Sequence, residues 1–203
     1  MAQGVHKITE EFENIVAKYT GALYAIALDN CSNAIFLALK YCGIENKKIL
    51  IPNRTYMSVP CEIIHAGGKV EFIQRQKKTL KGAYPLLPTR VWDSALRFTS
   101  NMYIPDSFMC LSFTGPHKHL KLSKGGMILT DDEEAMKWFK RKRFSGRNEI
   151  SYFEDSFDTI GWNFYMMPEI AARGILLMSG MPKHNEDIEL EYPDLSQYPI
   201  YTQ

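Results

Sequence analysis

Residues 23–44 decide the fold class, and they read LYAIALDNCSNAIFLALKYCGI. The first seven, 23–29, are almost all apolar, which is typical of a strand buried on both faces in a parallel sheet flanked by helices. Small polar residues come next, and from Ser32 to about Tyr41 the sequence predicts a helix. A buried strand that leads directly into a helix predicts an α/β protein.

The sequence on both sides continues this alternation. Further strands are predicted at 48–52, 69–73, 89–93, 108–113 and 126–131. Further helices are predicted from Ile8 to about Gly21, from Ser58 to Ala66, from Asp131 to Arg143 and from Pro168 to about Met178. We therefore predict a mostly parallel sheet flanked by helices, in one domain over residues 1–180, followed by an extended C-terminal tail over residues 181–203.

Composition excludes several classes of protein. The chain has 203 residues, 45% of them hydrophobic, and a formal net charge of +1, so its overall charge attracts it neither to nucleic acid nor to an anionic membrane. The four cysteines form no C-x-x-C pair, which argues against a disulfide framework or a metal cage. Because no apolar run approaches the roughly 18 residues of a membrane helix, and the N-terminus lacks a leader pattern, we expect a cytoplasmic protein.

Polar side chains follow three of the predicted strands. Ser32 opens the helix after the first, Asp93 ends the strand at 89–93, and Ser112 ends the strand at 108–113, with Lys118 in the loop behind it. Ligands of open α/β sheets bind at the carboxyl ends of the strands, and helix starts bind anions. A lysine, a carboxylate and an anion-binding helix start are the groups that pyridoxal phosphate requires.

Each of these residues also has a simpler interpretation. Ser32 could cap its helix, Asp93 could cap the end of its strand, and Lys118 could be a solvated loop lysine. A basic stretch at 137–147 could suit nucleic acid, but helical spacing turns its cations to solvent, so a solvated helix end is the better interpretation. His117 and His119 have no carboxylate or thiolate nearby, so we predict no metal site.

Several segments in collinear order carry a resemblance to a known family. They are FENIVAKYTGALYAIALDNCSNAIFLALKYCGI at 12–44, IPNRTYMSVPCEIIHAGGKVEF at 51–72, WDSA at 92–95, CLSFTGPHKHL at 110–120, KGGMILTDD at 124–132 and GWNFYMMPEIAARGILLM at 161–178. Together they resemble the DegT/DnrJ/StrS family of pyridoxal-phosphate-dependent sugar aminotransferases. The resemblance implies the large domain of an aspartate-aminotransferase-like, fold-type I enzyme.

The resemblance also implies roles for individual residues. Ser32 and Asn33 match the pair that holds the cofactor phosphate, and Tyr56 matches the aromatic residue that stacks on the pyridine ring. Asp93 matches the acid that pairs with the ring nitrogen. Pyridoxal 5'-phosphate is therefore the expected cofactor, and these four residues, together with Ser112, Lys118 and Asn163, are expected to bind it.

Lys118 is the expected Schiff-base lysine. It follows Ser112, which matches the serine of the family's Ser-Phe pair. On composition alone Lys121 and Lys124 compete for the role, but the Lys-His-Leu context and the distance to Gly125-Gly126 favour Lys118. The expected catalytic residues are accordingly Lys118 and Asp93.

The resemblance implies a reaction and a set of partners. The expected reaction transfers an amino group, with glutamate as the expected donor, to a keto group of a nucleotide-linked sugar in amino sugar biosynthesis. Asn163 matches an asparagine that reaches the cofactor phosphate of the neighbouring subunit, which implies a homodimer with shared active sites. Nucleic acid, membrane and metal are not expected among its partners.

Departures from the family pattern leave an alternative open. Substitutions at Leu96, Arg97, Lys124 and Tyr165 put substrate handling in question. The segment between 72 and 91 is short, and most of the C-terminal small domain is missing after Met178. The alternative is a non-catalytic relic that binds pyridoxal phosphate, or one half of a split aminotransferase that acts as a binding partner.

Overall fold

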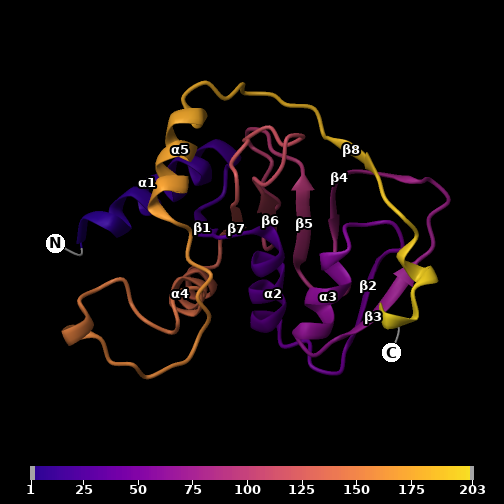
Figure 1. Cartoon of the computed structure of the whole chain (residues 1–203), viewed down its shortest axis with the longest axis horizontal. Helices are drawn as coiled ribbons and strands as arrows, with labels where there is room; N and C mark the ends of the chain where they lie inside the picture. The colour runs from indigo at the N-terminus through magenta and orange to yellow at the C-terminus, as the bar shows by residue number, and fades with distance from the viewer. Residues whose placement is uncertain (1–2, 202–203) are drawn as a thin grey trace.

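Helices pack on both faces of a six-stranded sheet in the computed structural model, which describes residues 3–201 (Figure 1). The helices are α1 (Gln3–Thr20), α2 (Cys31–Cys42), α3 (Ser58–His65), α4 (Glu133–Lys142) and α5 (Pro168–Met178). Each lies where the sequence predicts a helix, and α5 has the predicted bounds. Short 3₁₀ turns occur at 152–154, 195–197 and 199–201.

The start of α2 differs from the simpler interpretation of Ser32. The side-chain oxygen of Asn30 accepts a hydrogen bond from the backbone N–H of Asn33 at 2.8 Å, so Asn30 is the helix cap. Ser32 therefore does not cap the helix, and its hydroxyl contacts α3 instead. The helix ends at Gly43, whose φ of 60° is a left-handed value that glycine adopts without steric cost.

The strands form one six-stranded sheet and one separate pair. They are β1 (Tyr24–Leu28), β2 (Lys48–Pro52), β3 (Lys69–Ile73), β4 (Thr79–Pro85), β5 (Val91–Leu96), β6 (Phe108–Ser112), β7 (Gly126–Thr130) and β8 (Glu189–Glu191). The order in the large sheet is β1-β7-β6-β5-β4-β8, and β2 pairs with β3. The sequence did not predict β4 or β8.

The α/β fold is confirmed, but the large sheet is mixed rather than mostly parallel. Among the described strands of this sheet only β5 and β6 are parallel neighbours, and the other pairs are antiparallel. Burial explains the difference, because β7 is buried at every position yet runs against both neighbours, and an apolar run does not encode direction. Since β7 separates β1 from β6, the strands β1, β5 and β6 still point the same way.

Side chains on the two faces of the sheet form two apolar cores. Along β1, Ile26 and Leu28 enter the core that includes α2, α3 and α4, whereas Ala25 and Ala27 enter the core that includes α1 and α5. This strand is therefore buried on both faces, as its composition predicts. The two cores hold the carboxyl ends of β1, β5 and β6 at one edge of the sheet.

A buried ionic cluster ties the segment after α4 to the start of the chain. Arg143 is fully buried, and its guanidinium donates to the Glu13 carboxylate, to the carbonyl oxygen of Ala27 at 2.6 Å and to Glu149 at 2.6 Å. Paired charges with additional hydrogen bonds can offset the cost of burial. The interpretation of 137–147 as a solvated helix end is thus wrong for Arg143.

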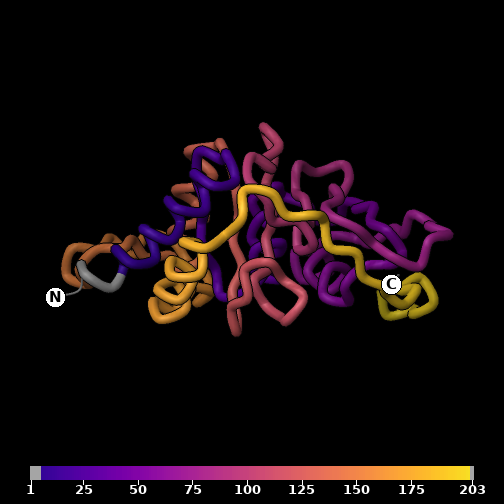
Figure 2. The backbone as a smooth tube through the Cα atoms, turned by 90° about the horizontal axis from the view of Figure 1, so that it is seen from above, coloured from indigo at the N-terminus to yellow at the C-terminus, as the bar shows by residue number. Residues whose placement is uncertain are grey.

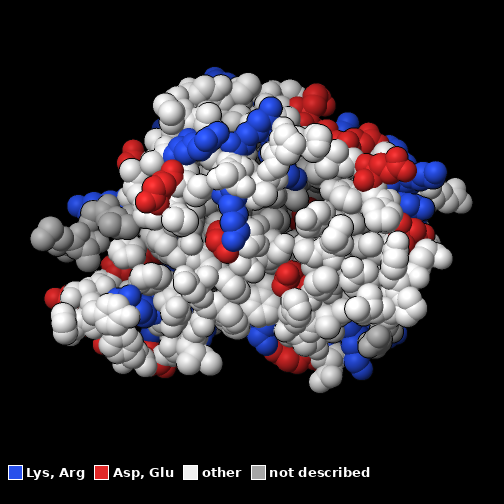
Figure 3. Space-filling view, in the orientation of Figure 1, with Lys and Arg blue, Asp and Glu red and all other residues white. Residues whose placement is uncertain are grey.

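Charged side chains of both signs are interspersed on the face seen in Figure 3. Within residues 3–201 no helix combines the length and apolarity of a membrane span. The same residues contain no group of three or more His, Cys, Asp or Glu side chains placed to hold a metal ion.

Candidate active site

A cavity of about 330 Å³ lies at the edge where β1, β5 and β6 end. This volume falls at the lower end of the range of small-molecule sites. The predicted site residues that line it are Ser32, Tyr56, Asp93, Ser112 and Lys118. The structure therefore brings together side chains that lie up to 86 positions apart in the sequence. It does not bring Asn33 or Asn163 to the cavity.

Asp93 is a buried carboxylate at the centre of a hydrogen-bond chain. It lies in β5, and its two oxygens accept hydrogen bonds from the backbone N–H of Ala95 at 2.9 Å and from the hydroxyl of Tyr84 at 3.0 Å. The Tyr84 hydroxyl also bonds Thr55 at 2.5 Å. Burial raises the pKa of Asp93, while these hydrogen bonds and the charge of Lys118 oppose the rise.

Lys118 is the cavity lysine. Its Nζ donates a hydrogen bond to the carbonyl oxygen of Ala95 at 2.5 Å, and burial lowers the pKa of its ammonium group. Lys121 and Lys124 do not line the cavity, and Lys124 forms an ion pair with Asp29 at 3.3 Å. Of the three lysines that the sequence left in competition, Lys118 alone lines this cavity.

The start of α2 presents hydrogen-bond donors to the same cavity. The Ser32 hydroxyl donates to the Ser58 hydroxyl of α3 at 2.7 Å, and both residues line the cavity. The first N–H groups of a helix have no carbonyl partner within the helix. A Cβ atom at Gly126 would lie 2.3 Å from the carbonyl carbon of Asn30, so glycine is needed where β7 passes this helix start.

Asn33 and Asn163 have other surroundings. The Asn33 side chain donates to Asp29 at 2.7 Å, which holds the turn before α2. Asn163 is exposed and pairs with Phe144 through a backbone bridge, at the base of a lobe (residues 144–167) that projects from the sheet (Figure 1). The phosphate-binding roles of both asparagines stay predictions.

Two of the four departures from the family pattern lie in or beside the cavity. Leu96 is buried and forms an apolar part of its wall, and Arg97 forms a bidentate ion pair with Asp187 of the C-terminal segment. The other two lie elsewhere. Lys124 is at the surface, and the Tyr165 ring packs under the guanidinium of Arg143.

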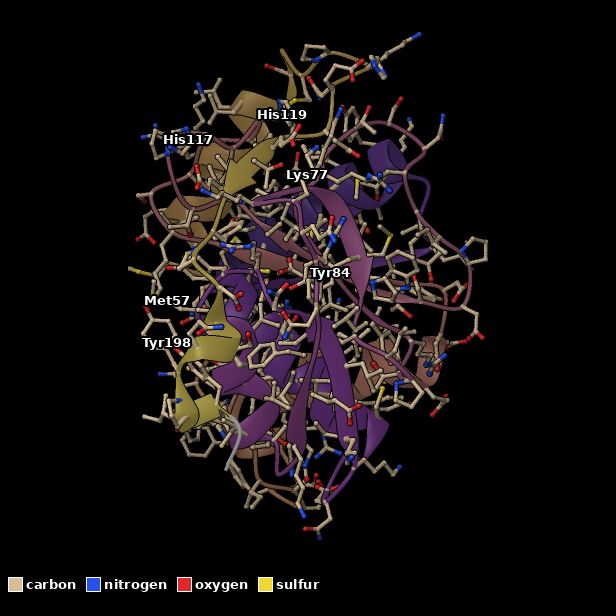
Figure 4. All side chains as sticks on the ribbon, turned by 90° about the vertical axis from the view of Figure 1, so that its right-hand side faces the viewer. Met57, Lys77, Tyr84, His117, His119 and Tyr198 are labelled. Carbon is tan, nitrogen blue, oxygen red and sulfur yellow. The ribbon has the colours of Figure 1, made fainter. Side chains whose placement is uncertain are left out.

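Sequence reasoning missed several residues that shape the cavity. Tyr84 lies on β4, an unpredicted strand, and sits in the interior of the molecule (Figure 4). Leu190 and Tyr192 come from the C-terminal segment, more than 70 positions after Lys118. The only sequence signal for these three residues is their apolar or aromatic character, which does not indicate where a tail returns.

Cys31 also lines the cavity, but as an unreactive thiol. Its Sγ donates to the carbonyl oxygen of Cys110 at 3.5 Å, and burial raises its pKa well above the usual range. A protonated, buried thiol is a poor nucleophile. Cys31 is therefore not a candidate nucleophile of the cavity.

Comparisons of sequence relate the chain to aminotransferases. The sequence model of the DegT/DnrJ/EryC1/StrS aminotransferase family matches residues 3–83. A UDP-4-amino-4,6-dideoxy-N-acetyl-beta-L-altrosamine transaminase of Campylobacter jejuni is 33% identical over 209 aligned positions, which cover 83% of this chain and 56% of the relative. The chain thus spans little more than half the length of that relative.

Solved structures share the fold. A Streptococcus pneumoniae protein assigned as a sugar aminotransferase, in its PMP form, superposes with a TM-score of 0.73 at 19% identity, over 86% of this chain and 59% of that one. Helicobacter pylori PseC, an aminotransferase of pseudoaminic acid biosynthesis, gives a TM-score of 0.72 at 15% identity, over 86% and 58%. At these identities the likeness supports the fold alone.

Proposed function

Because the chain belongs to the DegT/DnrJ/EryC1/StrS aminotransferase family, we propose that it transfers amino groups with bound pyridoxal 5'-phosphate. The observation that carries this proposal is the meeting of a partly buried lysine, Lys118, and a buried carboxylate, Asp93, in one cavity at the start of α2. Titratable groups with shifted pKa values in a cavity are typical of active sites.

The side chains that line the cavity suit this cofactor. The Asp93 carboxylate is suited to pair with the ring nitrogen, and the Lys118 amine is suited to react with the aldehyde carbon. The hydroxyls of Ser32 and Ser58, with the helix start behind them, suit the phosphate. Tyr56 is half exposed at the cavity and suits stacking on the ring. When bound, pyridoxal phosphate supplies an electron-withdrawing ring that stabilises negative charge on the substrate carbon.

Lys118 and Asp93 have different roles in the proposed reaction. Burial lowers the pKa of Lys118, which raises the fraction of neutral amine that can attack a carbonyl as the Schiff-base lysine and accept a proton as a base. Asp93 stabilises the positive charge of a protonated ring nitrogen. A carboxylate about 3 Å away, at an effective dielectric constant near 20, contributes on the order of 5 kcal/mol.

We further propose a keto group of a nucleotide-linked sugar as the acceptor and glutamate as the donor, in the cytoplasm. The name of the Campylobacter jejuni relative, a UDP-sugar transaminase, supports the substrate class. The alternative of a binding relic or half of a split enzyme is not favoured by the comparisons, which find transaminases. Turnover with an amino donor separates the two proposals.

An absorption titration tests the proposed function. Added to the purified chain, pyridoxal phosphate is expected to gain a visible band distinct from that of the free cofactor, and glutamate is expected to change that band as the amino group moves. A spectrum identical to free cofactor at saturation would contradict both proposals. A bound spectrum that no amino donor alters would favour the relic or the split enzyme.

We propose that two copies share their active sites, with Asn163 of each reaching the cofactor phosphate of the other. The lobe at 144–167 supports this, because several of its apolar side chains are exposed, Phe153 fully and Ile160 by 86%. Exposed apolar patches mark protein interfaces. We expect a homodimer in sedimentation, and we expect Asn163→Ala to weaken cofactor binding by about 1 to 3 kcal/mol, the cost of losing a hydrogen bond to a charged group.

Mixing Lys118→Ala and Asn163→Ala chains, at a cofactor concentration too low to fill the sites of the Asn163→Ala homodimer, tests whether sites are shared. A dimer of one Lys118→Ala chain and one Asn163→Ala chain contains one site with both native residues. If subunits exchange at random, mixing should restore about a quarter of the sites. Asn14→Ala, which changes an exposed asparagine of α1, is the matched control and should leave affinity unchanged. A monomer that binds tightly, or no recovery on mixing, would contradict sharing.

A further inference from the structure

The C-terminal segment runs back over the edge of the sheet that holds the cavity. After α5 the chain passes above the ends of β7, β6 and β5 and reaches β4 on the far side (Figure 1). The view from above shows the same path across the middle of the molecule (Figure 2). There β8 pairs with β4 in antiparallel register, with Leu80 opposite Leu190. The segment therefore covers the cavity edge.

Polar contacts fix the first half of this path. Arg97, just beyond β5, donates to both oxygens of Asp187 at 2.9 and 2.6 Å. Ile188 donates to the carbonyl oxygen of Leu96 at 2.9 Å and accepts from the N–H of Gly82 at 3.1 Å. A Cβ atom at Gly82 would lie 2.2 Å from the Asp187 carboxylate, and φ there is +71°, so the close approach requires glycine.

A second set of contacts fixes the backbone of Tyr192. Its carbonyl oxygen accepts from the guanidinium of Arg54 at 3.0 Å, and its N–H donates to the carbonyl oxygen of Lys78 at 3.2 Å. Three residues later Leu195 is buried and donates to the carbonyl oxygen of Asn53 at 2.7 Å. Tyr192 is thus held from both sides.

The Tyr192 side chain lines the cavity with a hydroxyl that lacks a protein partner. Within residues 3–201 this hydroxyl makes no hydrogen bond. Burial, together with Asp93, Tyr56 and Cys31, raises its pKa to about 12, so it stays protonated at neutral pH and can donate. Asp93 and Tyr56 are the proposed partners of the pyridine ring.

We propose that Tyr192 is a further cofactor-contacting residue, whose ring forms one wall of the cavity and whose hydroxyl donates a hydrogen bond to an oxygen on the pyridoxal ring. The inference rests on the proposed function, since it needs the cofactor in this cavity. It assigns the C-terminal segment a direct part in binding, beyond covering the sheet.

Binding titrations with pyridoxal phosphate and with pyridoxal test this assignment without any measurement of activity. Tyr192→Phe removes only the hydroxyl, which has no internal partner to lose, so the fold should persist. We expect a roughly 2- to 10-fold weaker affinity for both probes, as for one neutral hydrogen bond. Tyr192→Ala, which also removes the wall, should weaken binding further.

Tyr198→Phe is the matched control. Tyr198 is half exposed at the outer side of the molecule, near Met57 (Figure 4), and does not line the cavity. Its variant should bind both probes as the native chain does. Native affinity in Tyr192→Phe and Tyr192→Ala would overturn the inference and leave the proposed function standing. If Tyr192→Phe weakened the binding of pyridoxal phosphate but not that of pyridoxal, the proposed hydrogen bond to the ring would be overturned. A native chain that binds neither probe would overturn the proposed function itself.

Discussion

Replacing Lys118 with alanine is expected to lower amino transfer by about 10²- to 10⁴-fold or more, because the chain loses both its Schiff-base amine and its base. In the native chain, borohydride reduction with bound pyridoxal phosphate should fix a pyridoxyl group on the peptide that contains Lys118. Peptide mass mapping reads this directly. The reduced Lys118→Ala chain should carry no such group.

Two neighbouring lysines provide the controls for this experiment. Lys121→Ala and Lys124→Ala change residues of the same loop that do not line the cavity, so both variants should keep the adduct on Lys118 and near-native rates. An adduct on Lys121 or Lys124 in the native chain, or none at saturating cofactor, would refute the assignment of Lys118.

Asp93→Asn is expected to retain cofactor but to slow amino transfer by up to about 10⁴-fold. An amide has nearly the volume of the carboxylate but cannot stabilise a protonated ring nitrogen, and the lost interaction is on the order of 5 kcal/mol. Single-turnover spectra with glutamate measure the rate, and the titration of cofactor measures retention. An unchanged rate would contradict the role of Asp93.

Tyr84→Phe is the matched control for Asp93. It removes one hydrogen bond to the same carboxylate, formed at 3.0 Å, but leaves the negative charge in place. We expect a loss of about tenfold or less. A loss as large as that of Asp93→Asn would mean that the hydroxyl, rather than the charge, controls the reaction.

The sequence predicted the parts of the fold that local pattern controls. The strands β2 and β3 and the helix α5 have their predicted bounds, because apolar runs between turn residues and Pro168 at a helix start are local signals. Strand direction was not predictable in this way, since direction depends on which strands become neighbours. The strands β4 and β8 were missed because β4 contains Lys81, Gly82 and Pro85, and β8 has three residues.

The candidate site was predictable to the extent that its residues follow strand ends. Ser32, Asp93 and Lys118 meet because β1, β5 and β6 point the same way, a property that survives in the mixed sheet. Tyr84 and Tyr192 were not predictable, because their positions depend on the register of β4 and on contacts made by a distant tail.

The pairing of β8 with β4 also bears on aggregation. An open sheet edge offers unpaired backbone donors and acceptors to other chains. Here the last strand at that edge is only three residues long, and both of its end residues, Glu189 and Glu191, are exposed carboxylates that repel a further strand. Detachment of β8 would expose the seven-residue β4 instead. Changes that loosen the C-terminal segment should therefore reduce the yield of soluble protein as well as cofactor affinity.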